Sequence, residues 1–159
     1  IALIENHIPV MGVIYAPALS SLFFASKDKG TYKTICSKKI DSFSNSSKLF
    51  TSNKNRSEKI NVLSSRSHAD NFLKDWLNSN IQKYEIIKKG SSLKFCDIAE
   101  GTADLYIRFN PSCEWDIAAG HMILLEAGGK IKTIDEKKIL YNTKENVKNP
   151  SFIASCNLI

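Results

Sequence analysis

The 159-residue sequence has no apolar run approaching the roughly 18 residues that a membrane-spanning helix needs. No stretch at its start resembles the basic and apolar regions of a signal peptide. It also has no Cys-x-x-Cys pair and no histidine at zinc spacing from a cysteine, although it contains Cys36, Cys96, Cys113 and Cys156. We therefore expect no transmembrane segment and no zinc site, and we expect free thiols in a reducing, cytoplasmic compartment.

The sequence also lacks aromatic residues interleaved with its basic ones, which a nucleic-acid-binding face would show. Lys and Arg number 22 against 16 Asp and Glu, so the net charge is +6 and suits anionic partners. The basic residues are dispersed, and we therefore expect no nucleic-acid partner. Hydrophobic residues make up 43% of the chain, enough for a core of single-domain size.

The chain divides into two parts with different patterns. Residues 1–35 carry apolar runs separated by short polar turns, which predict a β-meander. Residues 37–59 are rich in Ser, Asn and Lys and predict a long exposed loop. We place the boundary in this loop, so that residues 1–59 are the end of an N-terminal lobe and residues 60–159 form a C-terminal lobe.

The second part alternates strand and helix patterns, which is typical of an α/β lobe. The four apolar residues of its first helix, Phe72, Leu73, Trp76 and Leu77, are expected on one buried face. Strands are predicted at 60–65, 84–88, 103–109, 130–134 and 152–156, and helices at 68–79, 91–100 and 116–127. Gly101 is expected to end the second helix.

Asp116 is expected where the last helix begins. Asp is a good N-cap residue, because its carboxylate accepts a backbone N–H. A carboxylate oxygen is also a hard ligand suited to Mg²⁺, and one carboxylate can serve both roles. The neighbouring Trp115 is expected to pack and hold the turn in place.

Four more polar residues lie at junctions between predicted elements. Ser91 could cap its helix, or it could mark a helix start that presents N–H groups to an anion, with Lys94 adding a charge one turn later. Arg108 could be a solvated strand end or a fork for phosphate. His68 could cap or pack, or it could contact a ligand at the carboxyl ends of the strands. With Asp116, these residues predict a shared cleft.

The sequence resembles a known family over nearly all of its length, except mainly in the predicted loop. The motif Trp-Asp-Ile-Ala-Ala-Gly at residues 115–120 is typical of the inositol monophosphatase superfamily. The stretch 90–108, with Lys94 and Arg108, is similar to its 3′(2′),5′-bisphosphate nucleotidase branch, in the bacterial form.

This resemblance implies an α+β fold, a layered α-β sandwich, and a Mg²⁺-dependent phosphatase with two or three metal ions and sensitivity to Li⁺. The implied reaction removes the 3′-phosphate of adenosine 3′,5′-bisphosphate, a product of sulfur metabolism, and leaves AMP. Asp116 matches a metal ligand of the family. The positions that contact the nucleotide in the family are matched by His68, Ser91, Lys94 and Arg108.

The family's other metal ligands, a Glu and an Asp-Pro-(Leu/Ile)-Asp-Gly-Thr segment, are not in this sequence. The chain also begins with Ile1, in strand-like sequence. We therefore expect the C-terminal portion of a longer protein, with no catalytic residue of its own and no activity in isolation.

Two alternatives stay open. One is an inositol monophosphatase-type sugar phosphatase, which Lys94 and Arg108 disfavour. The other is a non-catalytic nucleotide-binding fragment. The sequence indicates neither an oligomeric state nor whether the protein associates peripherally with the inner membrane, as some bacterial relatives do.

Overall fold

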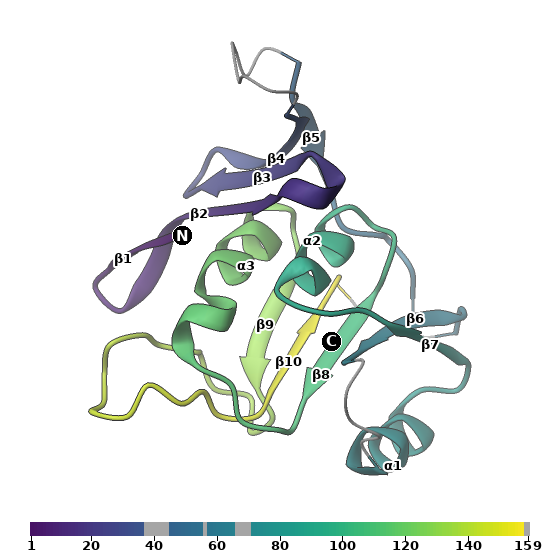
Figure 1. Cartoon of the computed structure of the whole chain (residues 1–159). Helices are drawn as coiled ribbons and strands as arrows, with labels where there is room; N and C mark the ends of the chain where they lie inside the picture. Colours follow the sequence, from purple (N-terminus) through teal and green to yellow (C-terminus); the bar gives the residue numbers. More distant parts are fainter. Residues whose placement is uncertain (37–44, 56, 66–70, 158–159) are drawn as a thin grey trace.

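The structure is a computed structural model that describes residues 1–36, 45–55, 57–65 and 71–157 (Figure 1). Two five-stranded sheets enclose a layer of two helices between them, as Figure 1 shows. The expected layered arrangement of sheets and helices is confirmed. No helix in the described part of the chain is long and apolar enough to cross a membrane.

The first sheet is an antiparallel meander whose spatial order follows the chain. Its elements are β1 (Ala2–Glu5), β2 (Ile8–Ala16), a 3₁₀ turn (Pro17–Leu19), β3 (Ser21–Ser26), β4 (Gly30–Ile35) and β5 (Ser47–Leu49). The β1–β2 turn places Asn6 and His7 at φ 49° and 66°, the left-handed values that tight hairpin turns require. The predicted meander is thus confirmed through β4.

Strand β5 corrects the prediction of a continuous exposed loop at residues 37–59. It pairs with β4, with Thr31 opposite Leu49 and Lys33 opposite Ser47. Its short and polar sequence has no apolar alternation, so only the tertiary pairing with β4 makes it a strand.

The second sheet is mixed, and its order departs from that of the chain. Its strands are β6 (Ile60–Ser64), β7 (Tyr84–Lys88), β8 (Leu105–Arg108), β9 (Lys130–Thr133) and β10 (Phe152–Ser155), in the order β7-β6-β8-β10-β9. Strand β6 is parallel to β7 and β8, whereas β10 is antiparallel to β8 and β9. The parallel pairs require crossover connections, which α1 (Asn71–Asn80) and α2 (Leu93–Ala99) provide.

Helix α3 (Glu114–Glu126) lies between the two sheets, beside α2 (Leu93–Ala99). Nine of its 13 residues are buried, so it is covered on most sides rather than on one face. Two glycines allow α3 to lie close to β2 and to α2. A Cβ on Gly12 of β2 would lie 2.5 Å from the Ala119 carbonyl oxygen, and one on Gly120 would lie 2.3 Å from the Phe95 ring.

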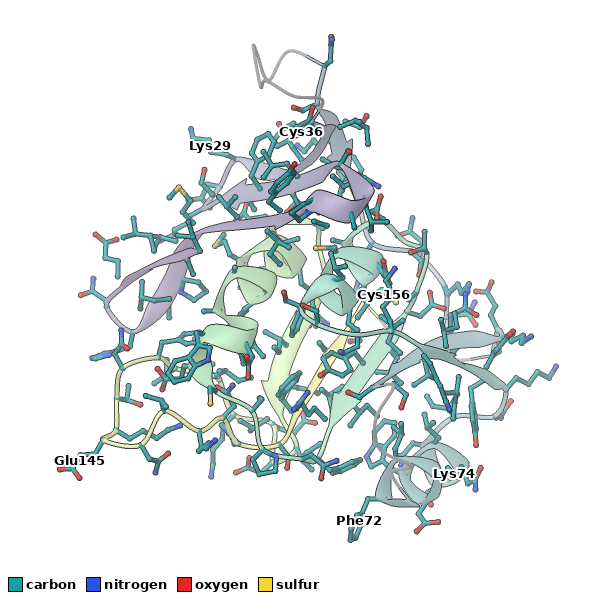
Figure 2. The ribbon with its side chains drawn as sticks, viewed as in Figure 1. Lys29, Cys36, Phe72, Lys74, Glu145 and Cys156 are labelled. Atoms are coloured by element: carbon teal, nitrogen blue, oxygen red, sulfur yellow. The ribbon has the colours of Figure 1, made fainter. Side chains whose placement is uncertain are left out.

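Helix α1 (Asn71–Asn80) packs on the second sheet through Leu73 and Leu77, which join its core, with Trp76 partly buried beside them. Phe72 was expected on the same face, but its side chain is 73% exposed and points away from the body of the molecule (Figure 2). The prediction was wrong there because Phe72 precedes Leu73 by one position and so lies about 100° around the helix from it.

A buried carboxylate connects the segment after β5 to the second sheet. Asp104 is fully buried and accepts hydrogen bonds from Ser52 Oγ (2.5 Å) and the Asn61 backbone N–H (2.8 Å). It also accepts a bond from Lys54 Nζ at 2.7 Å. Part of the predicted loop is therefore fixed to the sheet by a charged pair.

Cys36, Cys96 and Cys113 are free thiols, as the sequence predicted. Gly101 adopts φ 72° just after α2, which agrees with its predicted role at the helix end.

Candidate anion-binding site

A cavity of about 470 Å³ opens between α2, β8 and the first turn of α3. Four of the five predicted site residues line it, namely Ser91, Lys94, Arg108 and Asp116. The fifth, His68, lies outside the described residues. The complete lining is Ser65, Gly90, Ser91, Ser92, Lys94, Phe95, Tyr106, Arg108, Ser112, Trp115, Asp116 and Ile117. The sequence thus located a cavity whose residues come from several separate segments.

Lys94 reaches this cavity from the first turn of α2 and is only 3% exposed. Its Nζ donates to the carbonyl oxygens of Ser91 (3.0 Å) and Lys89 (3.4 Å). The pKa of Lys94 is lowered from its usual 10.5 to about 8, mainly by burial and also by the nearby Arg108 charge, while Asp97 acts in the opposite direction. The ammonium therefore has little water around it, and an anion in the cavity would meet a poorly solvated charge.

Arg108 ends β8 and is half-buried, and it is not the freely solvated strand end that was the alternative. Its Nε donates to the Asn110 carbonyl at 3.1 Å and its Nη2 to the Pro111 carbonyl at 3.0 Å. Its Nη1 donates to the Tyr106 hydroxyl at 3.3 Å. These bonds fix the plane of the guanidinium, and its remaining N–H groups can serve an anion.

Tyr106 connects these two cations, and sequence analysis missed it. Lys94 Nζ lies 4.7 Å from the centroid of the Tyr106 ring, a cation–π distance, while the Tyr106 hydroxyl accepts from Arg108. We call Lys94, Tyr106 and Arg108 the cationic cluster. A signal for Tyr106 did exist, because it lies two positions before Arg108 on a strand and so shares its face.

Asp116 is the third residue of α3, not its N-cap as the sequence suggested. The N-cap is Cys113, and Asp116 Oδ2 accepts the Cys113 backbone N–H at 2.8 Å in a capping box. The carboxylate is exposed on the cavity wall and keeps further lone pairs for a cation.

Two other expectations at the rim are corrected. Ser91 does not cap α2, because the N-cap is Ser92, which makes no side-chain cap bond, and Ser91 itself has φ 61°. Trp115 was expected to be packed, but it is 69% exposed, because it lies on the face of the first helical turn that borders the cavity.

A magnesium site needs several oxygen ligands around one point. Within the residues that the structure describes, no group of three or more His, Cys, Asp or Glu side chains could hold a metal ion. Asp116 therefore belongs to no such group, and the described residues do not by themselves fit Mg²⁺.

Comparisons with known proteins match one family over nearly the whole chain. Two curated relatives are each called 3′(2′),5′-bisphosphate nucleotidase CysQ. The one from Buchnera aphidicola is 40% identical over 98% of this chain and 55% of its own length. The one from Escherichia coli K12 is 37% identical over 98% of this chain and 58% of its own length. The chain thus spans little more than half of each relative.

Solved structures with a similar fold come from the same family. CysQ from Bacteroides thetaiotaomicron superposes with a TM-score of 0.86 at 34% identity, covering 99% of this chain and 62% of that one. An inositol monophosphatase from Anabaena, at 23% identity and a TM-score of 0.71, covers 97% of this chain and 59% of that one and shares the fold. The sequence profile of the inositol monophosphatase family matches residues 1–156. The chain belongs to the inositol monophosphatase family.

Proposed function

We propose that this chain is the nucleotide-binding part of a 3′(2′),5′-bisphosphate nucleotidase. The whole protein would hydrolyse the 3′-phosphate of adenosine 3′,5′-bisphosphate to AMP and phosphate, in sulfur assimilation or nucleotide turnover. The observation that carries the proposal is the cationic cluster, two oriented cations facing one cavity that Asp116 also lines. The names of the 37% and 40% identical relatives support it.

The cationic cluster suits a ligand with separated phosphates. Phosphoryl transfer depends mainly on positioning the phosphate and neutralising its charge. Lys94 would act as a buried point charge and Arg108 as a planar fork, so the two would hold the nucleotide from different directions. Ser91 at the rim and His68, which follows β6, would add contacts to the nucleotide.

Asp116 would contribute one oxygen ligand to Mg²⁺ in the whole protein. Bound magnesium ions, two or three in the proposed enzyme, would polarise the phosphate and activate water. The capping bond uses Oδ2 and fixes the direction of the carboxylate. The other ligands would come from protein beyond these 159 residues, so the isolated chain would bind nucleotide without turning it over.

Two broader points belong to the same proposal. The free thiols support a reducing, cytoplasmic location. The change of sheet between β5 and β6 supports a division into an N-terminal lobe ending near residue 59 and a C-terminal lobe after it.

The test compares phosphate release by the full-length protein from adenosine 3′,5′-bisphosphate and from inositol 1-phosphate, with Mg²⁺ present. We expect the nucleotide to be the faster substrate. Faster turnover of inositol 1-phosphate would instead favour a sugar phosphatase. Binding of the nucleotide without turnover of either substrate would favour a binding protein.

Arg108→Ala should mainly raise KM for the nucleotide, because it removes binding that ground and transition states share. Lys74→Ala is the control, because Lys74 is an exposed cation on α1, outside the site cavity (Figure 2). An equal loss in both variants would show only an effect of net charge.

A further inference from the structure

We propose that Tyr106 is a positioning residue that sets the direction of both cations of the cluster toward one anion. Its ring would hold Lys94 and its hydroxyl would hold Arg108. This inference rests on the proposed function in naming a nucleotide phosphate as the anion. The contacts themselves involve only the side chains of Lys94, Tyr106 and Arg108.

The contacts use two different parts of one side chain. The ring lies under the ammonium, with Lys94 Nζ 4.7 Å from its centroid. The hydroxyl accepts from Arg108 Nη1 at 3.3 Å. Tyr106 is therefore shared by the two cations, although Lys94 and Arg108 come from different elements, α2 and β8.

Two cations beside one cavity repel each other, and Arg108 is one reason why the pKa of Lys94 is low. An acidic side chain between them would hold both, but it would also compete with an anionic ligand for them. Tyr106 is uncharged, so it orients the cations through its ring face and its oxygen while it leaves their positive charge for the ligand.

Tyr106 is itself held firmly. It is 3% exposed and makes edge-to-face contacts with Phe95 and Phe152, at centroid distances of 5.6 Å and 5.4 Å. These rings belong to the core of the second sheet. The packing of Tyr106 in the core therefore keeps both cations oriented before a ligand binds. The entropic cost of ordering these side chains on binding is then small.

The simpler interpretation is that Tyr106 is only a core residue. Tyr106→Phe separates the two ideas, because it keeps the ring and its packing and removes only the hydroxyl that accepts from Arg108. Tyr106→Leu removes the ring face as well. Tyr84→Phe is the matched control, because its hydroxyl also makes one side-chain bond, to Asn78 Oδ1 at 2.8 Å, but on the surface of β7.

The experiment measures dissociation constants of AMP and adenosine by calorimetry on the full-length protein and on each variant. Tyr106→Phe should weaken AMP binding about fivefold and leave adenosine binding unchanged, because one hydrogen bond to a charged group is lost. KM for the bisphosphate should rise by a similar factor with kcat within about twofold. Tyr106→Leu should weaken AMP binding further, by about tenfold or more.

Equal weakening of AMP and adenosine in Tyr106→Phe, or no change in either, would overturn the inference. Inorganic phosphate is the second probe. If the wild-type protein binds phosphate but not AMP, the nucleotide proposal fails, and the role of Tyr106 stands only if Tyr106→Phe weakens phosphate binding. If the wild-type protein binds neither, both proposals fail.

Discussion

The two sheets of this molecule follow different rules of construction. In the first, every strand pairs with the next one along the chain, so its connections are local. In the second, β6 lies between β7 and β8, and chain segments far apart in sequence meet. All lining residues of the site cavity lie between Ser65 and Ile117, in the second part of the chain. Crossover connections gather polar side chains at one edge, and a meander does not.

Helix α3 belongs to both halves. Its first turn supplies Asp116 to the cavity, while Glu126 at its far end accepts the backbone N–H groups of Asp28 (3.0 Å) and Gly30 (2.7 Å) in the first sheet. We therefore expect substitutions around the site cavity in the second part to alter the activity of the full-length protein. Substitutions where the two halves meet should instead lower the free energy of unfolding.

The largest effect should come from Asp116→Asn in the full-length protein. Asparagine can still accept the Cys113 N–H, so the helix start should remain, but the negative charge that the proposed metal site needs is lost. Turnover should fall about a thousandfold, some 4 kcal/mol of transition-state stabilisation. Steady-state kinetics measures this, with Asp75→Asn on exposed α1 as the control. Near wild-type turnover in Asp116→Asn would show that Asp116 does not bind the metal ion.

The next effect concerns the connection between the halves. Lys54→Ala leaves the fully buried Asp104 carboxylate without its cation, which should lower the free energy of unfolding by about 3 kcal/mol. Urea denaturation measures this. Lys59→Ala is the matched control, because the Lys59–Glu85 pair is mostly exposed and should contribute under about 1 kcal/mol. Equal losses of unfolding free energy in the two variants would show that the buried Lys54–Asp104 pair stabilises the fold no more than an exposed pair does.

Gly12→Ala tests the contact of α3 with the first sheet. The new Cβ would lie 2.5 Å from a backbone oxygen that cannot move alone, so we expect a loss of about 2 kcal/mol of unfolding free energy. Thermal and urea unfolding measure it. Gly90→Ala is the control for stability, since nothing lies within 4 Å of its added Cβ. An unchanged Gly12→Ala protein would show that the halves can separate slightly at no cost.

The smallest effect is a pH dependence in the second part. Lys94 has a pKa of about 8, lowered mainly by burial, so it loses its charge as the pH rises from 7 to 9. AMP binding should weaken over this range, by up to about tenfold at one pH unit above the pKa. Calorimetry across the range measures it. Lys94→Arg should abolish the dependence, since arginine stays charged; persistence of the dependence would assign it to another group.

The sequence predicted the first sheet well because its signals are local. Apolar runs separated by turns at Asn6-His7 and near Gly30 determine the hairpins directly. Strand β5 could not be predicted, since its residues pair with β4 only after the fold brings them together. The exposure of Phe72 was missed for a similar reason, because apolar spacing alone did not say which side of α1 would meet the sheet.

The site was partly predictable. Lys94, Arg108 and Asp116 were found at element junctions, and the structure brings them to one cavity. The bonds that orient them were not predictable, because a carbonyl or ring acceptor leaves no mark in the sequence. Trp115 was misjudged for a related reason, since large aromatic residues are usually packed and its exposure depends on how α3 is oriented.

The carbonyl bonds of Arg108 have one more consequence. Asn110 and Pro111, which hold the guanidinium, begin the short strap that leads to Cys113, where α3 starts. The far side of this strap is fastened by Asn149, whose amide donates to the Cys113 carbonyl. The guanidinium of Arg108 and the first turn of α3, which carries Asp116, are therefore joined by one short segment that is hydrogen-bonded at both of its ends.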